Sequence, residues 1–237
     1  MPGPTTIGTL RETSLHAALK SWFARPGDEI EVTVDGFHVD LRRDDLLIEI
    51  QTRNFRSLKR KLLSLVEHHP VRLVHSIAAE KWIVRLPGDG GPPISRRRSP
   101  KHGCLEDLFA ELVTFPELVQ HSNFTMVVLL THEEEVLQPV SAGHGRRASW
   151  RRKGWEICDR RLLDVMEQTL LCSPSDFDRF LPARLPGQFT NQDLAAATGQ
   201  SLTLAQKTTY CLRGMSLVEC VGQRGRSLLF SRVTAVP

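Results

Sequence analysis

Three polar side chains in the first quarter of the chain have the types and spacing of a metal-assisted hydrolytic site. Asp40 lies in the run 37–41, and Glu49 and Gln51 lie in the run 46–52. Because side chains alternate along a strand, Glu49 and Gln51 point to the same face of the second run. Two carboxylates beside one strand suit Mg²⁺ (or Mn²⁺), which prefers oxygen ligands and takes few of them from the protein. The spacing predicts a divalent-metal site.

The elements that must hold these residues are predicted from hydrophobic periodicity and turn residues. They are a helix at about 9–23, strands at 30–34, 37–41 and 46–52, a basic helix at 55–68, strands at 71–77 and 81–86, a helix at 105–112 and a buried strand at 124–130. Turn residues between the first three strands indicate an antiparallel meander. Its second hairpin would bring Asp40 within reach of Glu49.

This order of elements, with Asp on the second strand and Glu-x-(Lys) on the third, resembles the PD-(D/E)xK nuclease superfamily. The resemblance covers about the first ninety residues and extends to about residue 135. It implies an α/β (α+β) restriction-endonuclease-like core with a mixed sheet. It also implies that Asp40, Glu49 and Glu12 are metal ligands and that Asp40, Glu49 and Gln51 are catalytic, with Gln51 in the lysine position.

The glutamine at position 51 is the main departure from the superfamily pattern. An amide can orient water, but it offers no positive charge to the phosphoryl group in the transition state. Members of the superfamily with glutamine there sometimes take a basic residue from the next helix. Arg53, Arg56 and Lys59 are the candidates for that charge and for contacts with nucleic acid.

Each of these residues also has an ordinary structural interpretation. Glu12 follows Thr9 by three residues, so it could complete a capping box at the start of the first helix. Asp40 and Glu49 could pair with Arg42 or Arg53 as ordinary strand residues. Both interpretations stay open at the level of sequence.

The end of the chain resembles a winged-helix domain at about 188–232. A short helix capped by Thr190 and Asp193 ends at Gly199, and a second helix at 203–213 precedes a hairpin at 217–231. The resemblance implies DNA contacts from the second helix and the wing. The candidate residues are Gln206, Lys207, Arg213, Arg224 and Arg226. Winged helices also dock on proteins.

Basic residues are clustered although the net charge is only +4. One cluster, 96–101, falls in a Gly- and Pro-rich loop near 91–103. The other contains Arg151, Arg152 and Lys153 beside Trp150, a composition suited to phosphate contacts and base stacking or to a solvated arm. We expect a nuclease-like domain at 1–138, a basic linker at 139–153 and a mainly helical region at 154–237 that ends in the winged helix.

Composition excludes several other classes of protein. The longest apolar stretch, 126–130, is too short to span a membrane, and the start of the chain lacks a secretory signal pattern. The five cysteines, without a C-x-x-C pair, indicate reduced, mostly buried thiols. A cytoplasmic location and no membrane partner are expected.

The predicted function is metal-dependent hydrolysis of phosphodiester bonds, with DNA the favoured nucleic acid and the winged helix binding or positioning it. One alternative is a catalytically inactive protein with the nuclease fold that binds nucleic acid or acts as a regulator. In that case Gln51 marks the loss of catalytic activity. A second alternative makes both domains protein-interaction modules. Oligomeric state and protein partners do not follow from the sequence.

Overall fold

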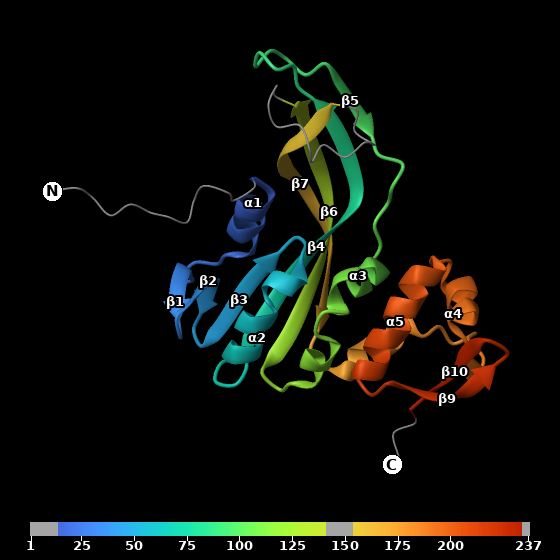
Figure 1. Ribbon diagram of the computed structural model, residues 1–237. Coiled ribbons are helices and arrows are strands. Elements are labelled where there is room, and N and C mark those ends of the chain that lie inside the picture. Colours follow the sequence, from blue (N-terminus) through green and yellow to red (C-terminus); the bar gives the residue numbers. More distant parts are fainter. Residues whose placement is uncertain (1–13, 141–153, 234–237) are drawn as a thin grey trace. The chain divides into compact units, whose positions relative to one another are not determined.

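The computed structural model describes residues 14–140 and 154–233 of the chain (Figure 1). The predictions for Glu12 and for Arg151, Arg152 and Lys153 lie outside these residues. The described residues form two compact units. The first holds those of Met1–Pro26, Ala78–Gly103 and Leu130–Glu167, and the second holds those of Gly27–Ile77, Cys104–Leu129 and Gln168–Pro237. The domain boundaries expected at 138 and 154 stay a prediction.

The protein is an α+β protein with a large mixed sheet. Its helices are α1 (Ser14–Phe23), α2 (Lys59–Leu65), α3 (Phe109–Leu112), α4 (Asn191–Thr198) and α5 (Leu202–Gly214). Its strands are β1 (Glu29–Val34), β2 (Phe37–Arg43), β3 (Leu46–Gln51), β4 (Val71–Arg85), β5 (Ser95–Arg98), β6 (Phe124–Pro139), β7 (Trp155–Leu171), β8 (Gln188–Phe189), β9 (Val218–Arg224) and β10 (Ser227–Arg232). Short 3₁₀ helices are η2 (Phe55–Ser57), η3 (Leu105–Leu108), η4 (Pro116–Gln120) and η6 (Pro174–Phe180).

The second unit contains the predicted meander. β1, β2 and β3 are antiparallel neighbours, with Leu41 of β2 opposite Ile48 of β3. β3 then pairs in parallel with the first part of β4, where Leu47 lies beside Val71. Parallel neighbours require a crossover connection, and η2 with α2 supplies it. The larger sheet has the order β1-β2-β3-β4-β6-β7, with β5 paired to β4.

Apolar side chains of the crossover anchor it to the core of the second unit. Leu62 and Leu65 of α2 are buried, as the amphipathic pattern predicts. The Phe55 ring is fully buried, stacks on Phe115 with ring centroids 5.4 Å apart, and meets the edge of the His75 ring at 4.8 Å. Burial of these rings fixes where α2 begins relative to β3.

The first unit contains a strand where the sequence indicated only a basic loop. β5 pairs antiparallel with β4, so the expectation of a loop near 91–103 is wrong for these four residues. Arg96 donates to Glu134 at 2.7 Å, and its guanidinium lies 5.1 Å from the Trp82 ring centroid. These contacts and the backbone pairing favour the strand over a solvated loop. The strands expected at 71–77 and 81–86 are one continuous strand, β4.

A buried carboxylate cluster lies on β6 of the first unit. Glu133 and Glu135 are buried, and Glu135 faces Arg160 at 3.4 Å and Lys81 at 3.7 Å. Burial raises the pKa of Glu133, and a hydrogen bond from the Thr131 hydroxyl at 2.8 Å partly offsets the effect. The acidic run of residues 133–135 is therefore partly interior.

The expected helical region from residue 154 onward is wrong at its start. Trp155–Leu171 forms β7, a strand of 17 residues beside β6. Its sequence is rich in Leu, Arg, Glu and Met, which are good helix formers, and this is why local propensity favours a helix. Backbone pairing with β6 supplies hydrogen bonds that an isolated segment lacks, so tertiary context overrides that propensity.

The end of the second unit contains the predicted helix pair and hairpin. The Thr190 side chain accepts from the Asp193 N–H while the Asp193 carboxylate accepts from the Thr190 N–H, a capping box that starts α4. Gly199 ends α4 with φ of 73°. β9 and β10 form the hairpin, and β8 completes a three-stranded sheet of order β8-β10-β9. Figure 1 shows these elements gathered around α5.

Helix α5 packs on α3, η3 and η4 of the same unit. Lys207 donates to the Ala110 carbonyl at 3.1 Å, and Gln120 donates to the Gly214 carbonyl at 2.6 Å. A Cβ added at Gly214 would lie 2.9 Å from a side-chain carbon of Pro116. The side of α5 that carries Lys207 and Gly214 is therefore covered by protein.

Two further expectations can be compared with the described residues. Among them, no helix has the length and apolar character needed to cross a membrane. The cysteines are mostly exposed rather than buried: only Cys211 lies in the core, and Cys104, Cys158, Cys172 and Cys220 are exposed. The expected burial is wrong because these four lie near strand ends, turns and edges, outside the apolar core.

The close approach at Gly214 predicts that any side chain at this position lowers the free energy of unfolding. Gly214→Ala should destabilise the protein by about 1–3 kcal/mol, because the methyl group meets Pro116. Gly187→Ala is the matched control, since nothing lies within 4 Å of its added Cβ, and it should be neutral or stabilising. Urea unfolding measures the stability of both variants. Equal unfolding midpoints for the two variants would contradict the packing of α5 on η4.

Candidate functional site

Asp40 and Glu49 lie at neighbouring positions of β2 and β3. Leu41 is paired with Ile48, so one step further along the antiparallel register Asp40 faces Glu49 on the same side of the sheet. The Asp40 carboxylate accepts a hydrogen bond from the Ile50 N–H at 2.8 Å. This bond directs the Asp40 side chain toward the backbone of β3. The register thus gives Asp40 and Glu49 neighbouring positions on the two strands, and the metal site remains a prediction.

The Glu49 carboxylate forms an ion pair with the ammonium group of Lys61 on α2. The Glu49 side chain is 10% exposed and that of Lys61 is 14% exposed, so both charges are largely withdrawn from water. In a low-dielectric surrounding such a pair attracts strongly. Sequence reasoning missed Lys61.

A signal for Lys61 was nevertheless present in the helical spacing. Leu58 and Leu65 are buried, and Lys61 lies three residues after the first and four before the second. Positions three and four apart lie on one helix face. A lysine at such a position must pair or extend past the core, whereas the neighbouring Lys59 and Arg60 are exposed.

Gln51 is held by the loop that follows β3. Its side-chain amide donates to the Asn54 carbonyl at 3.3 Å and to the Ser57 hydroxyl at 3.4 Å. Asn54 has φ of 62°, a left-handed conformation that asparagine tolerates and that turns the chain into η2. The amide nitrogen of Gln51 is thus hydrogen-bonded to the turn after β3. The amide oxygen is the atom that can accept a hydrogen bond from water.

A buried histidine lies next to Gln51 on β4. His75 is 3% exposed, and its Nδ1 lies 2.7 Å from the Gln51 carbonyl. Burial lowers the pKa of His75, although the Gln51 hydrogen bond and the charge of Glu111 act in the opposite direction. Since a carbonyl only accepts, Nδ1 donates. His75 is therefore a neutral side chain on β4 that makes a structural contact with the neighbouring strand β3.

The other basic candidates near β3 lie at the surface. Arg53, Arg56 and Lys59 are exposed, and Lys61 on α2 contacts Glu49. Arg42, a possible partner of Asp40, contacts Glu29 instead at 2.8 Å. The structure thus brings Lys61, which the sequence analysis did not name, into contact with Glu49.

The chemistry of this donor set can be compared with the needs of a divalent cation. Among residues 14–140 and 154–233, no group of three or more His, Cys, Asp or Glu side chains is arranged to hold a metal ion. Asp40 and Glu49 are two hard oxygen donors, and Mg²⁺ is commonly bound through one or two carboxylates with water completing its shell.

The winged-helix candidates are placed in different surroundings. Lys207 is bonded to α3, and Arg224 pairs with the capping residue Asp193. The Arg213 guanidinium lies 6.0 Å from the Phe230 ring centroid, and its side chain remains exposed. Gln206 and Arg226 are also exposed.

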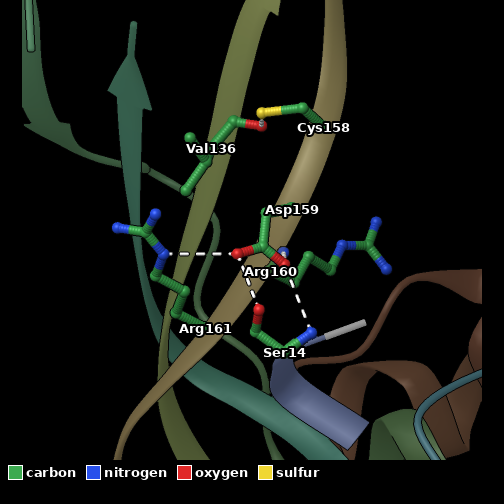
Figure 2. A network of polar contacts seen from close by, with 6 residues as sticks. All are labelled: Ser14, Val136, Cys158, Asp159, Arg160 and Arg161. Carbon is green, nitrogen blue, oxygen red and sulfur yellow. Dashed lines mark hydrogen bonds and ion pairs between the residues drawn. The ribbon is translucent and has the colours of Figure 1, made fainter. Parts of the chain in front are cut away.

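A polar network in the first unit connects α1 to β7 (Figure 2). The Asp159 carboxylate accepts from both the backbone N–H and the hydroxyl of Ser14, the first residue of α1, at 3.2 and 2.9 Å. It also accepts from the Arg160 N–H at 2.8 Å and from Arg161 at 3.3 Å. Burial acts to raise the pKa of Asp159, but the hydrogen bonds from Ser14 and the next two residues hold it below its ordinary value. A carboxylate at a helix N-terminus is favourable to the helix dipole.

Comparison with other sequences places the chain in a family. It belongs to the family defined by the domain of unknown function DUF8091, whose profile matches residues 13–172. That range includes Asp40, Glu49 and Lys61. The chain is also similar to an uncharacterized protein of Treponema pallidum (strain Nichols), with 29% identity over 228 residues, which cover 96% of this chain and 88% of that protein. No solved structure matches the chain.

The Asp159 contact predicts a pH-dependent contribution to stability. Asp159→Asn should cost about 1 kcal/mol at pH 7, because α1 loses a charged acceptor at its first residue. Since the folded-state pKa is depressed, this contribution is complete above the unfolded pKa of about 3.9 and is lost as pH falls through the folded value.

Thermal unfolding of wild type and variant between pH 7 and pH 3 measures the effect. The control is Asp164→Asn, an exposed aspartate of the same strand that accepts only from the next residue's N–H. A wild-type-minus-variant difference that stays constant down to the lowest pH would contradict the assignment.

Proposed function

We propose that this protein is a metal-dependent nuclease of the PD-(D/E)xK type that hydrolyses phosphodiester bonds, with DNA as the favoured substrate. The observation that supports the proposal is the register of β2 and β3, in which Leu41 pairs with Ile48 next to Asp40 and Glu49, together with the parallel pairing of β3 and β4. A meander followed by a helix and a further strand, in a mixed sheet, is the order of elements that the superfamily resemblance implies. The cytoplasmic location expected from composition remains part of the proposal.

In this mechanism the chain's own residues position the reactants. Asp40 and Glu49 would hold Mg²⁺ (or Mn²⁺), which when bound supplies polarisation of a phosphoryl oxygen and a lower pKa for water. Gln51, fixed by Asn54 and Ser57, would accept a hydrogen bond from the attacking water through its amide oxygen. Water attacks phosphorus, the P–O bond to the leaving strand breaks, and no covalent intermediate with the protein is needed.

The inactive nuclease-fold protein is a second candidate because of one observation. Glu49 is 8% exposed and engaged by Lys61. If this pair serves only to fasten α2 to the sheet, the fold would bind nucleic acid or regulate without cleaving. Cleavage by the purified protein separates the two candidates.

We further propose that α4, α5 and the β9–β10 hairpin act as a winged-helix module. Support comes from the order of elements and from β8 joining the hairpin in the order β8-β10-β9. Because Lys207 and Arg224 are engaged inside the unit, the DNA contacts fall to Gln206, Arg213 and Arg226. Because one side of α5 is covered by protein, contacts of α5 with DNA bases would come from its opposite side.

Substitution of the carboxylates tests the catalytic proposal. Asp40→Asn and Glu49→Gln should each lower Mg²⁺-dependent cleavage of duplex and single-stranded DNA at least about 10²-fold. Asp45→Asn and Glu67→Gln, which change exposed acids of the same unit, should cleave like wild type. Melting temperatures confirm that the variants are folded. Cleavage that survives both site substitutions would refute the assignment.

A second experiment tests the winged-helix contacts. Arg226→Gln and Arg213→Gln should each weaken DNA binding and reduce the slope of log K against log salt by about 0.9, because each removes one phosphate contact. Arg179→Gln, an exposed arginine of η6, is the control. The slopes are measured by fluorescence anisotropy at salt concentrations between about 50 and about 200 mM. Unchanged slopes would assign the module to protein docking.

A further inference from the structure

The edge strand β5 of the first unit carries three consecutive arginines to which the proposed function gives no role. Among the described strands β5 pairs with β4 alone, and Arg96, Arg97 and Arg98 are all exposed. We propose that the side chains of these three arginines bind the phosphate backbone of a nucleic acid. The inference rests on the proposed function for its choice of DNA as the polyanion, and it requires neither a bound metal nor cleavage.

Backbone hydrogen bonds hold β5 in place at both of its ends. The Ile94 N–H donates to the Arg85 carbonyl at 2.8 Å, and the Ser99 N–H donates to the Lys81 carbonyl at 2.7 Å. Between these two bonds β5 pairs antiparallel with β4. The three arginines therefore extend from a fixed strand, and binding costs less conformational entropy than it would from a flexible loop.

Two of the arginines contact acids of strands that lie further inside the sheet. Arg98 forms an ion pair with Glu80 of β4, and Arg96 forms an ion pair with Glu134 of β6 at 2.7 Å. The Arg96 and Arg98 side chains nevertheless remain 50% and 53% exposed. Because a guanidinium group has five N–H donors, a single carboxylate leaves donors available for a phosphate. The ion pairs thus orient these arginines and leave them able to bind.

The third arginine adds a positive charge that the surrounding protein does not neutralise. Strand alternation directs Arg97 to the face opposite Arg96 and Arg98, and it has no ion-pair partner among residues 14–140 and 154–233. The segment Ala78–Gly103 holds six basic and two acidic side chains, an excess equal to the net charge of the whole chain. Positive charge concentrated along one edge attracts a polyanion.

A phosphate backbone fits this edge better than an extended acidic peptide does. A peptide would bind by adding a strand to the open edge of β5. Very short edge strands and charged side chains discourage strand addition, and β5 has four residues, of which three are arginines. A phosphate, in contrast, accepts two N–H bonds from one guanidinium group. The chemistry of the edge therefore favours phosphate.

The test is binding of the full chain to labelled duplex DNA in EDTA, followed by fluorescence anisotropy as salt is raised. Arg97→Gln should reduce the magnitude of the slope of log K against log salt by about 0.9, because one phosphate contact is lost. Replacing Arg96, Arg97 and Arg98 together by glutamine should reduce it by about 2.7. Arg97→Lys keeps a charge that contacts phosphate and should retain the wild-type slope. Arg161→Gln is the matched control, since this arginine of β7 is 52% exposed and paired with Asp159.

The outcomes separate the inference from the function on which it rests. If the β5 variants keep the wild-type slope while wild type binds and cleaves DNA, the inference is overturned and the nuclease function stands. If the slopes fall as expected but wild type does not cleave DNA in Mg²⁺, the inference stands and the nuclease function fails. Absence of DNA binding by wild type overturns both. Binding of a labelled poly-glutamate peptide through β5 in place of DNA also overturns the inference. If the triple variant does not fold, the exposed Arg97→Gln decides alone.

Discussion

The ion pair between Glu49 and Lys61 is the contact on which the organisation of the second unit depends. It joins the centre of β3 to α2, the helix that carries the chain across to β4. Removing Glu49 would leave the largely buried Lys61 ammonium without this partner, and breaking a buried pair typically costs about 3–5 kcal/mol. The position of α2, and with it the crossover from β3 to β4, therefore depends on this pair as well as on the buried Leu62 and Leu65.

The C-terminal elements show how packing narrows the possible use of a surface. In a free winged helix, the second helix offers one whole side to the major groove. Here one side of α5 is bonded to α3 through Lys207 and to η4 through the Gly214 carbonyl. Arg224, in the hairpin, serves the cap of α4 through Asp193. Charged residues that a sequence motif marks as DNA contacts are thus partly used to hold the unit together.

Local patterns in the sequence were sufficient for the meander and the helix pair, because alternation and turn residues decide these features over a few positions. They were insufficient for β7, whose helix-forming composition is overridden by pairing with β6. The contact of Asp159 with Ser14 joins residues 145 positions apart. Lys61 was missed because a cation on a helix is ordinarily assigned to the solvated face.

The polar face of β3 is used by the fold itself. The Glu49 carboxylate contacts the ammonium of Lys61 on α2, and the Gln51 amide donates to the Asn54 carbonyl and to the Ser57 hydroxyl. Each of these contacts occupies a donor or an acceptor that a ligand would otherwise use. A function for this face must therefore work together with contacts that also hold α2 and the turn after β3.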